Sequence, residues 1–270
     1  MFAKKIVLKS LFLVPLLLFS HLSIAASPTD PMKCKKELKG ELKNICLKAH
    51  LNDPKAQHTM GRYYVGQMDQ NIVDLPQAFY WHRRLSRLVD KMGFADPLYS
   101  ETMYNTGIFY SEGLGIKQNY KKALYWFKKS AGRGESIAML KLAMIYSNGH
   151  GVLADTKTSL YWLNKAVDAG ELDAIVLLAQ VYSEGKLLPR NDKKAFELLK
   201  LAATEKSSNA LFSLANFYFH GIGTEANVTV AKSLFSESCR LKVLEGCMAY
   251  HDIDIQEQNK HKQPINDLAL

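Results

Sequence analysis

The sequence of 270 residues lacks several patterns that would point to a particular chemistry. None of its eight histidines lies four residues from another, so the His-x-x-x-His spacing of helical metal sites does not occur. No segment has a convincing strand pattern, so no glycine-rich loop follows a strand to cradle a phosphate group. No basic run is interleaved with aromatic residues, which makes nucleic acid a poor candidate partner. We therefore expect no cofactor, no metal and no nucleic-acid partner.

Long apolar runs are also missing after the N-terminal segment. Three lysines precede an apolar run from Leu11 to Phe19, and Ser23 and Ala25 then supply small residues for cleavage. This layout is typical of a secretory signal peptide, and the run is shorter than the roughly 20 residues of a membrane helix. We expect residues 1–25 to be removed, the mature protein to be periplasmic or secreted, and no transmembrane segment to remain.

The net charge is mildly positive, and the cysteines are few. The formal net charge is +9, and it falls to +6 when the signal segment with its three lysines is removed. The four cysteines are an even number in a chain that is expected to be exported, which favours disulfides over metal ligation.

A phrase of about six residues recurs along most of the remaining chain. It reads YSEGLG, YSNGHG, YSEGKL and YFHGIG, and its copies are 36 residues apart, beginning at Tyr110, Tyr146, Tyr182 and Tyr218. A second phrase keeps the same step, with small residues at Ala123, Ser159, Ala195 and Ala231. An earlier copy begins near Ala56 and contains about ten extra residues, mostly around LVDKMGFADP. Self-similarity at this period predicts a repeat architecture.

Each copy has the pattern of two helices. The first places Ala138, Leu142, Ala143 and Tyr146 on one face and ends at a glycine-rich turn. The second runs over residues 120–131, with four lysines toward water. Because such a pair cannot bury its apolar face alone, we predict an all-α fold, a right-handed α/α solenoid. The Tyr-Trp pairs at 125–126 and 161–162 are then interpreted as packing residues.

The residues above resemble a known family. The order Ala, Leu-Gly/Ala, Tyr, Gly-x-Gly, Lys-Ala, Trp-Phe, Ala, Gly at 36-residue spacing resembles Sel1-like repeats, which are relatives of tetratricopeptide repeats. Five copies would cover residues 53–240, after a helical cap at 26–52 and before a capping helix at 241–252 and a polar tail at 253–270. Leu187 departs from the pattern, because it replaces the second turn glycine of the fourth copy.

The cysteines are expected to form two local disulfides at the ends of the solenoid. Cys239 and Cys247 are eight residues apart, a spacing similar to that of the bridged repeats in Helicobacter cysteine-rich proteins, which belong to the same group. Cys34 and Cys46 flank Gly40, which suggests a bridged hairpin before the first repeat. We expect no metal at either pair and no histidine at ligand spacing beside either of them.

Two functions fit this pattern. The resemblance implies an exported scaffold for protein–protein interaction, in the bacterial envelope or with a host partner. The alternative is an enzyme acting on the cell wall or on β-lactams, because β-lactamase activity has been ascribed to some Helicobacter relatives. The only Ser-x-x-Lys match, Ser183 to Lys186, falls where a helix should end, which suggests a chance match and no catalytic residue.

In related solenoids the first helix of each repeat lines the concave face, and the resemblance transfers those positions to this chain. They combine large apolar groups with polar ones, which suits a bound peptide or helix with apolar anchors and a polar rim. The candidate partner-binding groove comprises Arg62, Tyr104, Ile108, Met144, Gln180, Asn209, Phe212, Asn216 and His220. The alternative is that some of these residues pack under the next repeat instead of facing a partner.

Overall fold

The structure, a computed structural model, describes residue 34 and residues 38–93 and 97–262. Within these ranges the chain forms twelve helices and no strands. The helices are α1 (Gly40–His50), α2 (Pro54–Tyr64), α3 (Leu75–Met92), α4 (Pro97–Glu112), α5 (Tyr120–Ala131), α6 (Ser136–Asn148), α7 (Thr156–Asp168), α8 (Leu172–Glu184), α9 (Asp192–Thr204), α10 (Ser208–His220), α11 (Val228–Arg240) and α12 (Leu244–Lys262). The expected signal segment, residues 1–25, lies outside the described residues.

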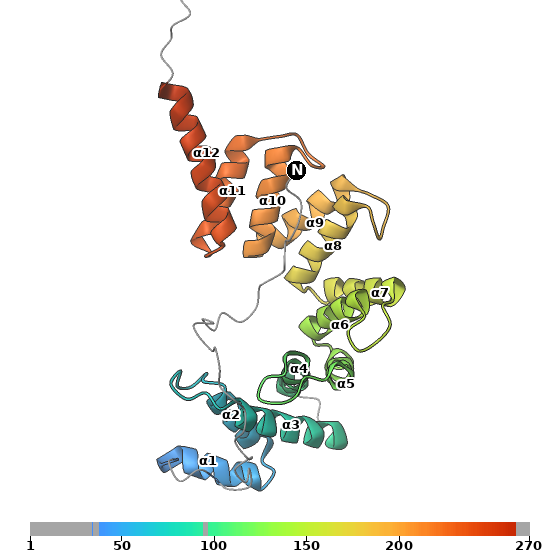
Figure 1. The fold of residues 1–270 in the computed structure, drawn as a ribbon, viewed down its shortest axis with the longest axis vertical. Helices are drawn as coiled ribbons and strands as arrows, with labels where there is room; N and C mark the ends of the chain where they lie inside the picture. Colours follow the sequence, from blue (N-terminus) through green and yellow to red (C-terminus); the bar gives the residue numbers. More distant parts are fainter. Residues whose placement is uncertain (1–33, 35–37, 94–96, 263–270) are drawn as a thin grey trace, which may run out of the picture.

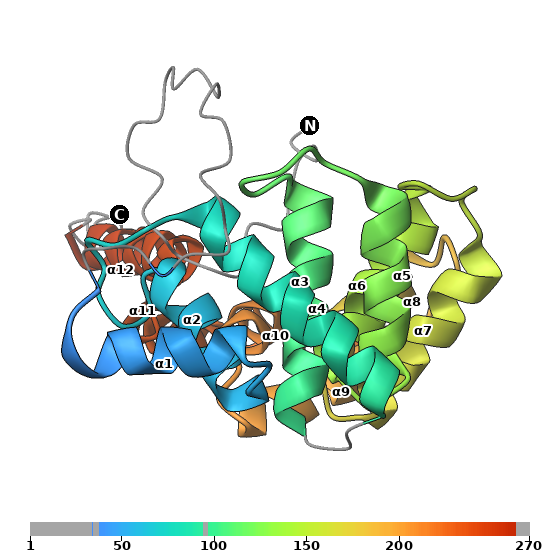
Figure 2. The same cartoon turned by 90° about the horizontal axis from the view of Figure 1, so that it is seen from below.

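The helices form successive hairpins along an arch, with α1 at one end and α12 at the other (Figure 1). Each first helix packs on its own second helix and then on the neighbouring hairpin, and α8 also contacts α10 directly. Seen from the end of the arch, α3 crosses α4 at an angle, whereas α4 and α5 run side by side (Figure 2). The prediction of an all-α helix-turn-helix solenoid is confirmed.

The start of each second helix is fixed by a side chain that recurs every 36 residues. Asn119, Asp155, Asn191 and Asn227 each accept a hydrogen bond from a backbone N–H in the first turn of the helix that follows. Such caps contribute about 0.5–2 kcal/mol each relative to alanine. Their own backbone N–H groups donate to the carbonyl oxygen of the repeated tyrosine, as Asn119 does to Tyr110 at 2.7 Å. The recurring tyrosine and the cap therefore form one turn unit.

Small residues let the two helices of a hairpin approach closely. A Cβ atom on Gly107 would lie 2.6 Å from the ring of Phe127, so no larger residue fits there without movement. In the next two repeats an alanine takes this place, and Ala143 and Ala179 share core clusters with the smaller Leu163 and Leu199. Residue sizes on the two helices thus compensate each other in the second, third and fourth repeats, whereas in the fifth repeat Ala215 shares a core cluster with the larger Phe235.

The two longest of the described helices are α3 and α12. The additional residues of the first repeat lengthen α3 to 18 residues, compared with 12 in α5 and 13 in α7. α12 continues to Lys262, past residue 252, where the sequence analysis ended the capping helix. No glycine or proline occurs between Gly246 and Pro264, and Ile253 is buried beside α11. Lys232 of α11 also pairs with Asp254, which adds contacts along this longer helix.

Candidate functional site

The nine candidate residues lie on α2, α4, α6, α8 and α10, which are the first helices of the five repeats. We call them the first-helix surface. α4 and α6 lie toward the inner side of the arch, with α5 and α7 toward the outer side (Figure 1). The nine residues differ widely in exposure. Arg62, Gln180 and His220 are exposed, whereas Ile108, Met144, Asn209, Phe212 and Asn216 are half-buried.

Tyr104 differs from the expectation for this surface. Only 4% of the residue is exposed, and its ring lies 5.8 Å from the ring of Phe127 on the second helix of the same repeat. Burial, and next the nearby carboxylates Glu135 and Glu171, raise the pKa of its hydroxyl above the ordinary value. Tyr104 is therefore a core residue, and truncating it would disturb the repeat rather than remove a surface anchor.

The apolar members of the first-helix surface are partly covered by their own neighbours. The ring of Phe212 lies 5.7 Å from that of Phe235, and Met144 and Ile108 pack against the edges of core clusters. Each of the three nevertheless keeps an accessible part on a first helix. They could therefore contribute apolar contacts to a partner without being fully desolvated in the free protein.

Several polar members are already hydrogen-bonded within the protein, one of them to the preceding repeat. Asn209 donates a hydrogen bond of 3.0 Å to Asp173 on the preceding first helix, and Arg62 donates to Gln67 in the turn after its own helix. Gln180 and Asn216 donate within their own helices, to Glu184 and to the carbonyl oxygen of Phe212. These side chains are already hydrogen-bonded, so a partner would have to share or replace these bonds.

A ladder of hydrogen bonds joins successive first helices, and the sequence analysis missed it. Ser100 donates to Glu135 at 2.8 Å, and 36 residues later Ser136 donates to Glu171 at 2.7 Å. The signal was present in the sequence, because both glutamates close the same repeated phrase. Without the geometry, however, nothing indicated that this glutamate reaches back to the preceding repeat.

The first repeat contains buried histidines instead of an all-apolar interior. His82 and His58 are 3% and 7% exposed, and a Cβ atom on Gly61 would lie 2.9 Å from Nε2 of His82. Burial, and to a smaller extent the neighbouring His58, lower the pKa of His82 to about 3. Burial also lowers the pKa of His58, partly opposed by Glu101. Both rings are therefore neutral in the folded protein at pH 7.

The two expected disulfides are present. Cys34 is bonded to Cys46, with 5.9 Å between their Cα atoms, and Cys239 is bonded to Cys247, with 4.5 Å. The second bridge joins the end of α11 to the first turn of α12, so a turn brings together two residues that one helix would keep apart.

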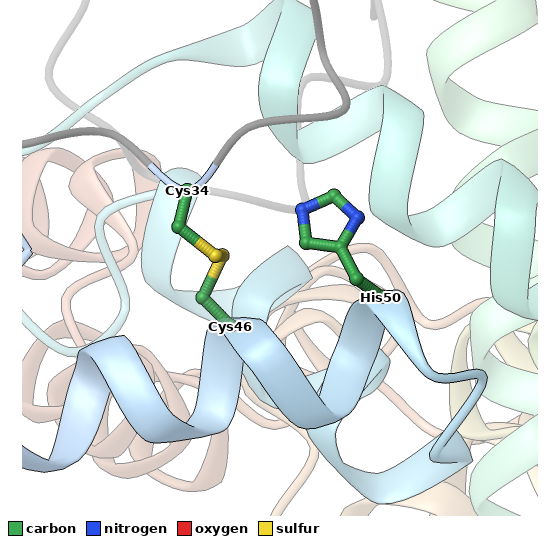
Figure 3. A group of neighbouring side chains, drawn as sticks. All are labelled: Cys34, Cys46 and His50. Atoms are coloured by element: carbon green, nitrogen blue, oxygen red, sulfur yellow. A yellow bond between two sulfur atoms is a disulfide. The ribbon is translucent and has the colours of Figure 1, made fainter.

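The expectation that no histidine accompanies the cysteines is wrong for the first pair. His50 lies one helical turn after Cys46 on α1, and ligand-type atoms of Cys34, Cys46 and His50 all lie within 4.8 Å of one another (Figure 3). Both sulfurs are joined in the disulfide, so neither is the thiolate that zinc requires. The His50 ring packs edge-on against Trp81 at 4.8 Å, which gives it a packing role.

Removing the C-terminal bridge should loosen one end of the molecule. We expect Cys239→Ser to lower the melting temperature by a few degrees, because the bridge closes a short loop and α12 has a neighbour on only one side. Hydrogen exchange should accelerate in α12 and remain slow in α4 to α7. Cys34→Ser is the matched control, since it should accelerate exchange in α1 instead. Faster exchange in α4 to α7 after Cys239→Ser would contradict this local role.

The Ser-x-x-Lys match does not form a catalytic pair. Ser183 lies at the end of α8 and donates a hydrogen bond to the carbonyl oxygen of Gln180, while Lys186 pairs with Glu184 at 3.1 Å. A nucleophilic serine needs a base within hydrogen-bonding reach, and each of these two residues has a different partner. This geometry gives no support to a β-lactam reaction at Ser183.

Comparison with known proteins identifies the repeat. A family model described as Sel1 repeat matches residues 54–90, 100–135, 136–171, 172–207 and 208–243. The chain belongs to the Sel1 repeat family. The five matched segments are the five repeats expected from the sequence, and each contains one hairpin from α2–α3 to α10–α11. The family is generally a non-enzymatic scaffold for protein interactions.

Two solved structures are similar to this Sel1 repeat chain. A Sel1 repeat protein from Oxalobacter formigenes aligns with a TM-score of 0.66 and 22% identity over 78% of this chain and 58% of that one. A protective antigen present in uropathogenic Escherichia coli strains, displaying an SLR fold, aligns with a TM-score of 0.53 and 26% identity over 84% of this chain and 54% of that one. The chain thus spans a little over half of the length of each. No curated relative matches it.

Within the described ranges, none of the helices is both long enough and apolar enough to span a membrane.

Proposed function

We propose that this Sel1 repeat protein is an exported scaffold that binds a protein or peptide partner, in the bacterial envelope or on a host. The observation that carries the proposal is the stack of five Sel1 repeats, since this family generally mediates protein interactions. Two disulfides support export, because such bonds persist in oxidising compartments. The N-terminal lysines and apolar run support it as well.

The first-helix surface is the proposed docking face. Ile108, Met144 and Phe212 come from three different repeats and would act as apolar anchors. Arg62, Gln180, Asn209, Asn216 and His220 would supply the polar rim. A peptide or helix lying along this face could contact several repeats at once. The apolar anchors would then be buried against it, and the polar residues would surround them as a rim. Tyr104 is left out of the contact set because it is buried.

A photo-crosslinking residue placed at position 144, on the first-helix surface, tests the docking face in intact cells. Position 161 is the matched site, since Tyr161 is exposed on the second helix of the same repeat. We expect one partner to be crosslinked at position 144, and its crosslink at position 161 to be weak or absent. The trapped protein is identified by mass spectrometry, produced on its own and used in the affinity measurement below. Trapping from position 161 alone would place the docking face elsewhere.

Truncating two of the anchors should weaken binding of that partner. We expect Ile108→Ala combined with Met144→Ala to raise the Kd at least tenfold, because each truncation removes apolar contact area. Isothermal titration with the purified partner gives the affinity, and circular dichroism shows whether helical content is kept. Leu153→Ala combined with Leu201→Ala is the matched control, because both leucines are exposed outside the first helices. A larger loss in the control pair would show that binding uses the other face.

Export can be tested on the protein purified from fractionated cells. We expect its N-terminus to be Ala26 or Ser27, because Ser23 and Ala25 provide the small residues before a signal cleavage site. Edman sequencing of the envelope or culture-supernatant fraction makes the measurement. Protein from that fraction that still begins at Met1 would contradict cleavage.

A further inference from the structure

A cleft with a volume of 390 Å³ opens between α3 and α5, the second helices of the first two repeats. Tyr110 and Trp126 form its floor and are both buried, while Tyr125 at its side is 46% exposed. The rest of the lining is almost entirely cationic. It consists of Arg83, Arg87 and Lys91 from α3 and Lys122 from α5, together with the single carboxylate Asp90.

The four cations have no ion-pair partner in the part of the chain that the structure describes. Arg83, Arg87 and Lys91 follow one another at four-residue intervals, so they form a row along one side of α3. Like charges at this spacing destabilise a helix slightly. A bound anion would remove that repulsion.

Asp90 cannot serve as their counter-ion, because it is already bonded to α5. Its carboxylate accepts a hydrogen bond of 2.8 Å from the hydroxyl of Tyr125 and pairs with Lys129 at 2.8 Å. Burial alone would raise the pKa of Asp90, but the bonds from Lys129 and Tyr125 hold it below the ordinary value. These contacts join the end of α3 to α5 and hold Tyr125 at the side of the cleft.

The next repeat junction shows that packing does not require every one of these cations. Tyr146 and Trp162 there correspond to Tyr110 and Trp126, so the aromatic framework belongs to the repeat. At the positions of Arg87 and Lys122, however, the following repeat has the uncharged Gly132 and Thr158, whereas Lys128 keeps a positive charge at the position of Arg83. Arg87 and Lys91 also stand on the final turns of α3, which the shorter α5 and α7 lack. The longer first repeat therefore has cations at this junction that the following junction lacks.

We propose that this cleft binds an acidic peptide segment in which Asp or Glu residues alternate along an extended chain. Successive cations on α3 are about one helical turn, roughly 5–6 Å, apart. Alternate side chains of an extended peptide are about 6.6 Å apart, so their carboxylates can meet successive cations. Arg83 and Arg87 can bind carboxylates through two parallel N–H groups, which a lysine cannot do. The cleft lies on second helices, so this inference does not rest on docking at the first-helix surface.

Fluorescence anisotropy with a labelled peptide of alternating glutamates, titrated with the full mature chain, tests the proposal. We expect saturable binding that weakens as salt is raised. Arg87→Gln combined with Lys122→Gln should raise the Kd at least tenfold. Lys157→Gln combined with Lys165→Gln on α7 is the matched control, because it removes the same net charge from exposed positions outside the cleft. The control pair should stay within twofold of the wild type.

Three outcomes would overturn this proposal. Equal losses in the two pairs of variants would show general charge attraction instead of a site. Undetectable peptide binding by the wild type would exclude this ligand class. A sulfated oligosaccharide that binds more tightly than the peptide and is lost in the same cleft variant would make the ligand a glycan. The Ile108→Ala, Met144→Ala variant of the first-helix surface should bind the acidic peptide with unchanged affinity. A failure of the cleft proposal can therefore be distinguished from a failure of the proposed docking face.

Discussion

When the pH is lowered from 7 to 4, the His82→Phe variant is expected to lose about 3 kcal/mol less stability than the wild-type protein. His82 is buried, and its Nδ1 atom has no hydrogen-bond partner among the described residues. The other repeats have Phe127, Leu163, Leu199 and Phe235 at the corresponding position. Phenylalanine is therefore a residue that the repeat accepts there, and it does not titrate.

The loss of stability at low pH follows from the difference between the pKa values of His82 in the unfolded and folded protein. In the unfolded chain the ring takes up a proton near pH 6.5, whereas burial keeps the pKa of His82 at about 3 in the folded protein. The unfolded state therefore binds more protons throughout that window, and stability falls as the pH is lowered from about 6.5 toward 3. His58 on α2 contributes in the same direction, since burial lowers its pKa, and Glu101 and Arg62 are the charges that act on it.

Denaturant unfolding at pH 7 and pH 4, followed by circular dichroism, gives the change in free energy for each protein. Acidic side chains titrate in the same window, so the informative quantity is the difference between wild type and His82→Phe. An exposed histidine serves as control, and His150→Asn should leave the acid sensitivity as in the wild type. If His82→Phe loses as much stability as the wild type on acidification, the buried ring does not carry the effect.

The fold could be predicted because each repeat satisfies the same local requirements. The tyrosine, the turn glycines and the small helix-facing residues recur at fixed positions, and the structure uses each of them as expected. Predictions were less accurate at the ends, where no repeat pattern applies. The longer α12 depends on the burial of Ile253 and on the pairing of Lys232 with Asp254, which join segments about twenty residues apart.

The candidate site was less predictable, because exposure on a first helix depends on how the neighbouring helix packs. The position of Tyr104 in the repeat suggested a surface anchor, yet its ring lies against Phe127. Lys129 looked like one of several solvated lysines, but it pairs with Asp90 across two repeats. The α3–α5 cleft was missed for the same reason, since its two walls are about forty residues apart in the sequence.

In three of the turns, the second glycine lies close to the preceding repeat, which the sequence alone does not reveal. Gly223 has a φ of +67°, and a Cβ atom there would lie 2.2 Å from the backbone oxygen of Asp192, at the start of the preceding second helix. Gly115 and Gly151 approach the preceding second helix in the same way, with closest distances of 2.5 and 2.6 Å for an added Cβ atom. Leu187 replaces this glycine in the fourth repeat and is 45% exposed there. The close approach is therefore a feature of three of the four junctions.

Gly223→Ala should consequently lower the free energy of unfolding by about 2–5 kcal/mol. The left-handed backbone costs an alanine roughly 1–2 kcal/mol, and relieving the overlap with Asp192 adds about 1–3 kcal/mol of strain. Gly170→Ala is the matched control, because Gly170 also has a positive φ, +79°, but an added Cβ atom would meet nothing within 4 Å. Gly170→Ala should lose only the roughly 1–2 kcal/mol of stability that the left-handed backbone costs an alanine. Denaturant unfolding of both variants measures the difference, and equal losses would show that the turn of one repeat does not press on the helix of the one before.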